Sequence, residues 1–166
     1  MKEGVSQYKL VRIAVESLIN SLRLHFDSIL LFKNKSFPSA FQLSVLSLEE
    51  FAKAKWVEHY IWSSLTNEGY PDVEFEQEWL KLLYRHPEKQ WAFMAREIWD
   101  YSPKFADFVK KRKLEEKKQN AIYVGLSRLK GKIDASSRVS TPNRIKEKDA
   151  RQLICKRLIN PVLPLA

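Results

Sequence analysis

The sequence has few of the residues that interrupt helices or cross-link a chain. Its 166 residues include only four glycines, seven prolines and one cysteine, Cys155. Because a lone cysteine forms neither an internal disulfide nor a cysteine-based metal site, a reducing compartment is expected. The N-terminus, MKEGVSQYKL, lacks the apolar core of a signal peptide, and no stretch of about 18 uncharged apolar residues is present. These absences predict a cytoplasmic protein without a membrane partner.

Several familiar catalytic motifs are also missing. The sequence contains no HExxH, no CxxC and no glycine-rich phosphate loop, which makes zinc hydrolases and nucleotide-triphosphate enzymes poor candidates. His25 and His59 fall in predicted helices without a metal-ligand pattern. We therefore expect neither a metal nor an organic cofactor. The five tryptophans are interpreted as core and helix-contact residues rather than as a platform for stacking bases.

Long stretches of the chain show helical periodicity instead. Between about Ser6 and Phe32, apolar residues recur every three or four positions, which marks one face of a helix. These residues are Val11, Val15, Leu18, Leu22, Phe26, Ile29 and Leu30. A second long helix is predicted from about Phe37 to Leu65, ended by Gly69 and Pro71.

Shorter helices are predicted over residues 73–85, 87–101 and 103–118, followed by a mostly irregular connection over 119–140. A last helix is predicted to open with Thr141 as N-cap and Pro142 at its first position. Together these elements predict an all-α fold, a bundle of two long antiparallel helices and shorter additional helices. We expect one domain over residues 1–166, with a loosely held tail from about residue 160.

The net charge of +9 is concentrated in the final third of the chain. Residues 1–103 carry 12 Lys/Arg and 14 Asp/Glu, a net of −2, whereas residues 104–157 carry 17 Lys/Arg and 6 Asp/Glu, a net of +11. Such asymmetry is typical of a face that binds a polyanion, with RNA or DNA the first candidates. The alternative is a solvated basic helix surface. The candidate RNA-binding residues are Lys110, Lys111, Arg112, Lys113, Lys117 and Arg128.

One charged residue falls on an apolar helix face. When residues 43–61 are placed at about 100° each around a helix axis, Glu50 lands in the middle of the apolar sector, with Lys53 on its flank. A buried charge must be paired, hydrogen-bonded or neutralised, because its desolvation otherwise costs several kcal/mol. Either Glu50 and Lys53 form a polar site between helices, or they are a structural pair that organises the packing.

Two further segments hold candidate site residues. His86 lies at a joint between helices, with Lys89 three residues later, and histidine suits proton transfer near neutral pH. A histidine at a joint is also common as a cap or surface residue. Lys117, Lys118 and Tyr123 form a basic helix end followed by an aromatic side chain, an arrangement that the helix dipole alone can explain.

In this order, these segments resemble the AbiV family of bacterial abortive-infection proteins. SAFQLSVLSLEEFAKAKWV is similar to a family helix with a Glu-Glu-x-x-Lys core, filled here by Glu49, Glu50 and Lys53. LYRHPEKQ resembles a His-x-x-Lys segment, filled by His86 and Lys89. EKKQNAIYVGL resembles a lysine-then-Tyr-Val segment, filled by Lys118, Tyr123 and Val124. The resemblance spans about residues 7–160.

The resemblance implies a HEPN-like helical bundle, a class whose members often dimerise and include metal-independent endoribonucleases of phage defence. Their usual signature is an arginine, then four to six residues, then a histidine. This chain lacks it, since Lys81 rather than an arginine precedes His86 at that spacing. The resemblance thus implies abortive infection, a homodimer and a phage-encoded activator, with AbiV-type members using a polar set of their own.

Metal-free RNA cleavage needs a base, an acid and cations for the developing charge. Glu49, Glu50 and His86 are the candidates for proton transfer, and Lys53, Lys89 and Lys118 for positive charge. Tyr123 could position a phosphate or stack a base. The leading hypothesis is a ribonuclease toxin that acts on RNA or translation. The alternatives are a non-catalytic module that binds RNA or protein and blocks translation, and dimerisation through a long apolar helix.

Overall fold

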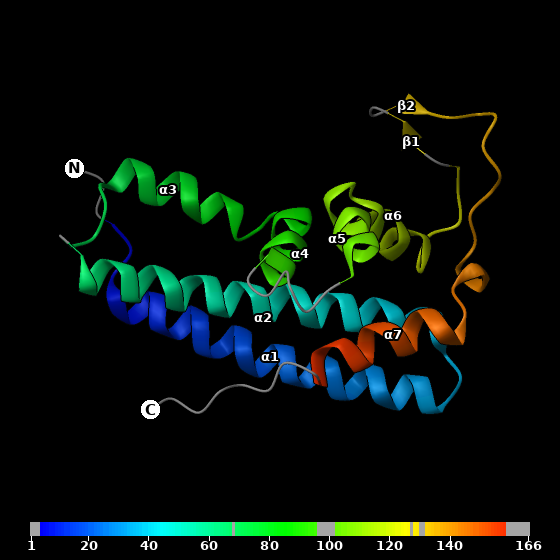
Figure 1. Ribbon diagram of the computed structural model, residues 1–166, viewed down its shortest axis with the longest axis horizontal. Coiled ribbons are helices and arrows are strands. Elements are labelled where there is room, and N and C mark those ends of the chain that lie inside the picture. Colours follow the sequence, from blue (N-terminus) through cyan, green and yellow to red (C-terminus); the bar gives the residue numbers. More distant parts are fainter. Residues whose placement is uncertain (1–3, 68, 96–101, 127, 130–131, 159–166) are drawn as a thin grey trace. The chain divides into compact units, whose positions relative to one another are not determined.

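The computed structural model describes residues 4–67, 69–95, 102–126, 128–129 and 132–158. Figure 1 shows that helices dominate this part of the chain, which confirms the all-α prediction. In chain order the elements are α1 (Gln7–Lys33), α2 (Phe37–Thr66), α3 (Val73–Leu82), α4 (His86–Ala95), α5 (Pro103–Lys110), α6 (Lys113–Asn120), β1 (Arg128–Leu129), β2 (Lys132–Ile133), the 3₁₀ turn η2 (Pro142–Arg144) and α7 (Glu147–Leu158). None of the described helices combines the length and apolar character that a membrane crossing requires.

The chain divides into two compact units, and each long helix contributes one part to each unit. The first unit comprises Met1–Arg23 and Ser47–Arg112, and the second comprises Leu24–Leu46 and Lys113–Ala166. The expectation of a single domain over the whole chain stays a prediction.

In the first unit, α1 and α2 pack through small side chains. The Ser21 hydroxyl donates a hydrogen bond of 2.7 Å to the carbonyl of Ser47, and the Ser47 hydroxyl donates one of 2.8 Å to the carbonyl of Ser21. Leu10, near the start of α1, packs with Val57, near the end of α2. The two helices are therefore antiparallel, as predicted, and the Ser21 and Ser47 hydroxyls are both hydrogen-bonded across the contact.

The apolar face of α1 that the sequence indicates is largely exposed. Val15, Phe26 and Leu30 are 50, 65 and 60% exposed. The buried residues of the same helix are mostly small or polar, and they are Leu10, Ser17, Ser21, Leu24, His25 and Ser28. Helical periodicity predicts α1 well, but it does not predict which face packs inward.

The apolar core of the first unit encloses a buried carboxylate. Tyr60 of α2 stacks on Trp79 of α3 with ring centroids 4.1 Å apart. The Tyr60 hydroxyl donates to Glu76 at 3.1 Å, and the Val5 amide donates to the other oxygen of Glu76 at 2.6 Å. Burial, the hydrogen bond and the negative charge of Glu76 all raise the pKa of Tyr60. At the start of α3, Asp72 caps the helix by accepting from the Phe75 amide at 2.8 Å.

In the second unit, α6 and α7 are joined by a hydrogen-bonded salt bridge. Lys117 Nζ donates to Asp149 at 2.7 Å and lies 5.4 Å from the centroid of the Phe41 ring. Burial alone would raise the pKa of Asp149, but the hydrogen bonds from Lys117 and from the Lys146 amide outweigh it and lower that pKa. The link between the two helices contains a two-residue antiparallel ribbon, β1–β2, in the region predicted to be mostly irregular.

Two sequence predictions about helix boundaries are wrong. The single helix predicted over 103–118 is two helices, α5 and α6, because Arg112 adopts a left-handed conformation with φ of 58° and interrupts the helical hydrogen bonds. The last helix does not begin at Pro142. Thr141 and Pro142 instead open η2, Thr141 makes no side-chain capping bond, and α7 starts at Glu147.

Candidate functional site

A carboxylate of α2 is held inside the first unit by side chains of α4. Glu49 is 1% exposed. One of its oxygens lies 2.5 Å from Nδ1 of His86, and the other accepts a 2.7 Å hydrogen bond from the side-chain amide of Gln90. The ammonium group of Lys89 lies 4.0 Å from the oxygen that faces His86. This arrangement satisfies a group that is otherwise costly to bury.

The neighbouring carboxylate faces a different helix. Glu50 accepts a hydrogen bond of 2.9 Å from Lys53, one turn further along α2, and one of 3.3 Å from Asn20 of α1. Lys89 lies 3.8 Å from Glu50, so this one ammonium group is close to both carboxylates. The Glu50 and Lys53 side chains are each 17% exposed. The predicted Glu50–Lys53 pair is thus present, at the edge of the packed region.

The sequence places Glu50 at the centre of the core face, whereas the structure gives that place to Glu49. The physical reason is that α2 packs on more than one side in the first unit. Successive residues of a helix point about 100° apart, so Glu49 meets α4 while Glu50 meets α1. A projection that assumes one buried face cannot separate the two.

The start of α4 explains why three of its side chains converge on Glu49. The helix begins at His86, and Pro87 occupies its first turn, where the missing amide hydrogen costs nothing. Residues three and four positions apart lie on one helix face. His86, Lys89 and Gln90 have this spacing, and their side chains face α2 together. Gln90 is a contact of Glu49 that the sequence motifs do not single out, and its position four residues after His86 is the signal for it.

The exposure of His86 distinguishes it from its partners. Its side chain is 48% exposed, whereas those of Lys89 and Glu49 are 6 and 1% exposed. An ionised carboxylate only accepts hydrogen bonds, so Nδ1 donates to Glu49 and the lone pair of a neutral ring lies on Nε2. Among the described residues, no hydrogen bond engages Nε2. The ring is therefore anchored on one side and accessible to solvent, as a proton-transferring histidine requires.

The other two predicted catalytic residues belong to the second unit. Lys118 of α6 is buried, and its ammonium group lies 2.7 Å from Glu115. Tyr123 follows α6 and is 62% exposed. The five residues Glu49, Glu50, Lys53, His86 and Lys89 are brought together in the first unit. The participation of Lys118 and Tyr123 in the same centre stays a prediction.

The candidate RNA-binding residues differ in how their charges are engaged. Lys110 is exposed at the end of α5. Three of the lysines are hydrogen-bonded to nearby carboxylates: Lys111 to Asp107 at 2.7 Å, Lys113 to Glu116 at 2.8 Å and Lys117 to Asp149 at 2.7 Å. Arg112 lies 3.7 Å from Glu88, and the side chain of Arg128 lies outside the described part of the chain. The pairs of Lys111, Arg112 and Lys113 are exposed and contribute about 1 kcal/mol or less, so a phosphate can compete for these three cations. The Lys117–Asp149 pair is partly buried and is less available.

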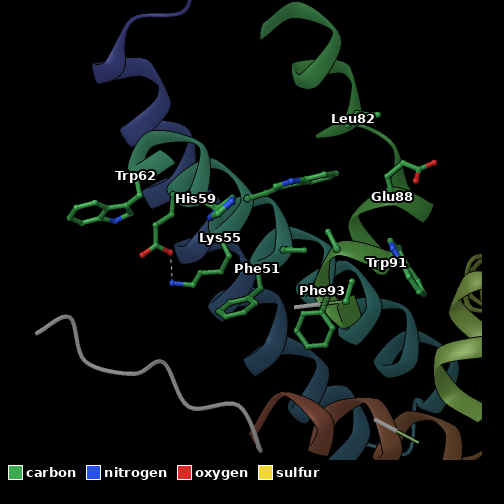
Figure 2. A pocket seen from close by; sticks show the side chains of 13 residues that line it. Phe51, Lys55, His59, Trp62, Leu82, Glu88, Trp91 and Phe93 are labelled. Atoms are coloured by element: carbon green, nitrogen blue, oxygen red, sulfur yellow. Dashed lines mark ion pairs between the residues drawn. The ribbon is translucent and has the colours of Figure 1, made fainter. Parts of the chain in front are cut away.

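Beside the polar centre, α2 and α4 also line an aromatic pocket. Figure 2 shows Phe51, Lys55, His59 and Trp62 of α2 on one side and Trp91 of α4 on the other. The pocket has a volume of about 840 Å³, and Lys55 forms an ion pair with Glu58 at its edge. The tryptophans, expected to be core and helix-contact residues, differ in burial. Trp79 is buried, Trp56 and Trp91 are half-buried, Trp62 is 56% exposed, and Trp99 lies outside the described residues.

The fold and this site define an all-α protein that carries a histidine–carboxylate pair between two packed helices. Comparison with protein families then gives the family. The HEPN-type family described as AbiV matches residues 9–158, most of the chain, and the protein therefore belongs to the AbiV family. No curated protein and no solved structure gives a match. Among the described residues, no group of three or more His, Cys, Asp and Glu side chains is placed to hold a metal ion.

Proposed function

We propose that this AbiV-family protein acts in abortive infection as a metal-independent ribonuclease, with His86 as the residue that transfers the proton. The observation that carries the proposal is the 2.5 Å contact between Nδ1 of His86 and the buried carboxylate of Glu49, on a ring that is half exposed. A carboxylate that fixes the orientation and tautomer of a histidine is a recurrent device for making its other nitrogen an effective base.

The roles of the remaining residues follow from their burial. With Nε2 unprotonated, His86 can take the proton from a ribose 2′-hydroxyl as that oxygen attacks the phosphorus. The resulting imidazolium is stabilised by Glu49 and can return the proton to the 5′-oxygen as its bond to phosphorus breaks. Lys89 is 6% exposed and lies near both carboxylates, so it organises them rather than contacting RNA. Lys53 is at the edge, 17% exposed, and could stabilise charge on a phosphate. The basic residues at the end of α5, which belong to the same unit, would hold the RNA backbone.

The test is cleavage of total RNA by the purified protein in EDTA. We expect fragments with the wild-type protein and a loss of at least about 100-fold with His86→Ala, the usual contribution of a positioned acid or base. His59→Ala is the matched control, because His59 is an exposed histidine of α2 outside the polar centre, and this variant should cut RNA normally. Circular dichroism of both variants checks the fold. Full cleavage by folded His86→Ala would refute the assignment.

A non-catalytic RNA-binding module is the second candidate. The observation that favours it is the charge balance of the centre, in which two carboxylates face two lysines and form a self-contained structural network. In that case the wild-type protein binds RNA and inhibits translation in a cell-free reaction without producing fragments. His86→Ala would then leave the inhibition unchanged, whereas replacing exposed basic residues such as Lys110 would weaken it and reduce its salt dependence.

A further inference from the structure

The two faces of α4 carry different side chains. One face, with His86 and Gln90, holds the buried carboxylate of α2. At about 100° per residue, Glu88, Trp91 and Ala92 lie on the opposite face, where they line the aromatic pocket. These three residues are here called the α4 wall. The helix that carries the proposed base therefore also forms one wall of a pocket within the same unit.

The indole of the α4 wall is placed to stack on a ligand. Trp91 is half-buried, and none of the ring contacts among the described residues involves it. By contrast, Phe51 and Phe93 of the same lining pack edge-on with centroids 6.0 Å apart. Ala92 adds only a methyl group beside the indole, which leaves room in the pocket. A half-buried, unstacked indole in a concave pocket suits the planar ring of a ligand.

The charges of this end of the pocket indicate what else the ligand carries. Glu88 lines the pocket and is 34% exposed, and its carboxylate lies 3.7 Å from the guanidinium of Arg112, which is 70% exposed. This separation is longer than a normal hydrogen bond, so both groups can still bind a ligand. A carboxylate accepts hydrogen bonds, and a guanidinium binds anions. The complementary ligand is a planar ring with an amino group, joined to a phosphate.

The neighbours of Arg112 favour a strand over a free nucleotide. Lys110 and Lys111 precede it in the same unit, and both are exposed. A run of three cations suits successive phosphates of a nucleic-acid backbone better than a single phosphate. Single-stranded RNA is commonly recognised by stacking a base on an aromatic side chain and bonding its edge. Cytosine carries an amino donor where uracil carries a carbonyl acceptor, so a carboxylate favours cytosine.

We propose that the α4 wall binds an unpaired, amino-bearing base of the RNA, stacked on Trp91 with its amino group donated to Glu88. The proposal rests on RNA being the substrate, and it assigns base selectivity to a site separate from His86. Figure 2 shows Glu88 and Trp91 at one end of the pocket, whereas His59 and Trp62 of α2 lie at the other end and take no part in this site.

The test is fluorescence anisotropy of labelled 2′-O-methyl oligonucleotides with the wild-type protein. Blocking the 2′-hydroxyl prevents cleavage, so affinity is measured without it. Oligocytidine should bind about 5-fold or more tightly than oligouridine. Trp91→Ala should weaken oligocytidine binding roughly 5- to 150-fold, the loss of one stacked base. Trp62→Ala is the matched control, because it removes a 56% exposed indole at the far end of the pocket and should leave binding unchanged.

Two further variants separate the roles within the α4 wall. Ala92→Leu keeps the indole but fills the space beside it, so it should weaken binding even if Trp91→Ala folds poorly. Glu88→Ala should abolish the preference for cytidine, and this ratio is unaffected by any gain in phosphate binding at Arg112. Circular dichroism checks the fold of each variant.

Several results would overturn the proposal. They are equal wild-type affinity for the two oligonucleotides, unchanged binding by folded Ala92→Leu, an equal loss from Trp62→Ala, or a cytidine preference that survives Glu88→Ala. Cytidine monophosphate binding as tightly as the oligonucleotide would assign the pocket to a free nucleotide instead. Failure of the ribonuclease proposal is a separate result, because it shows as an absence of fragments from total RNA.

Discussion

Replacing Glu49 by alanine removes the acceptor around which α4 is organised. Gln90 would lose its 2.7 Å hydrogen bond to the carboxylate, and a hydrogen bond to a charged group contributes about 1.5–3 kcal/mol. The removed atoms also leave a void beside a group that is 1% exposed, which adds roughly 1 kcal/mol. Water can replace the bond to His86, because that ring is half exposed. The expected total is about 3 kcal/mol of unfolding free energy.

Glu50→Ala is the matched control for this prediction. Glu50 is one position along the same helix, but it is 17% exposed and its Lys53 partner is equally hydrated, so we expect a loss of only about 1 kcal/mol. The assay is urea unfolding followed by tryptophan fluorescence. All five tryptophans lie between residues 56 and 99, within the first unit, so the signal reports the unit that contains both carboxylates. A cost below about 1 kcal/mol for Glu49→Ala, or an equal cost for both variants, would refute the reasoning.

Two pH dependences follow from the shifted groups. Because the pKa of Tyr60 is raised, the stability that its neutral hydroxyl contributes is complete below about pH 10, the pKa of an unfolded tyrosine, and is lost as the pH rises above that value. Tyr60→Phe should cost about 1–2 kcal/mol of unfolding free energy at pH 7 through the lost hydrogen bond to Glu76. The variant should also show a flatter decline of stability between about pH 10 and 12. An unchanged alkaline slope would contradict this. Because the pKa of Asp149 is lowered, its bond to Lys117 stabilises the fold above about pH 4, and this stabilisation is lost as the pH falls further. Asp149→Asn should therefore reduce the thermal stability measured by calorimetry at pH 7 but not at pH 2. Equal losses at both pH values would show that the charge does not matter.

The long helices could be predicted from the sequence, whereas one helix break could not. Apolar periodicity and proline positions set α1 and α2 to within a few residues of their observed bounds. The break between α5 and α6 occurs in KKRK, a run of good helix formers with no glycine or proline. The break is seen in the left-handed backbone of Arg112, a conformation that nothing in the local residue types predicts.

The site could be predicted in its residue types but not in its geometry. Glu49, Glu50, Lys53, His86 and Lys89 were all identified, and they do lie together in the first unit. Which carboxylate is buried was not predictable, because it depends on which helix covers each side of α2.

The orientation of α1 was hidden for a related reason. Its packed face carries serines, and hydroxyls such as that of Ser21 are satisfied by the backbone of α2. The stronger apolar signal, in residues such as Phe26, belongs to the exposed face. Hydrophobicity alone therefore points to the wrong face of α1 as the packed one.

The most direct test of the proposed centre is the protonation of the His86 ring, measured by long-range ¹⁵N–¹H correlation spectroscopy. Above the pH at which the ring loses its charge, the wild-type protein should carry the remaining proton on Nδ1, donated to Glu49, with Nε2 unprotonated. In Glu49→Ala the proton should move to Nε2, as in an isolated imidazole. A wild-type ring protonated on Nε2 would contradict the account, because His86 would then not be held by Glu49 and could not act as the proposed base.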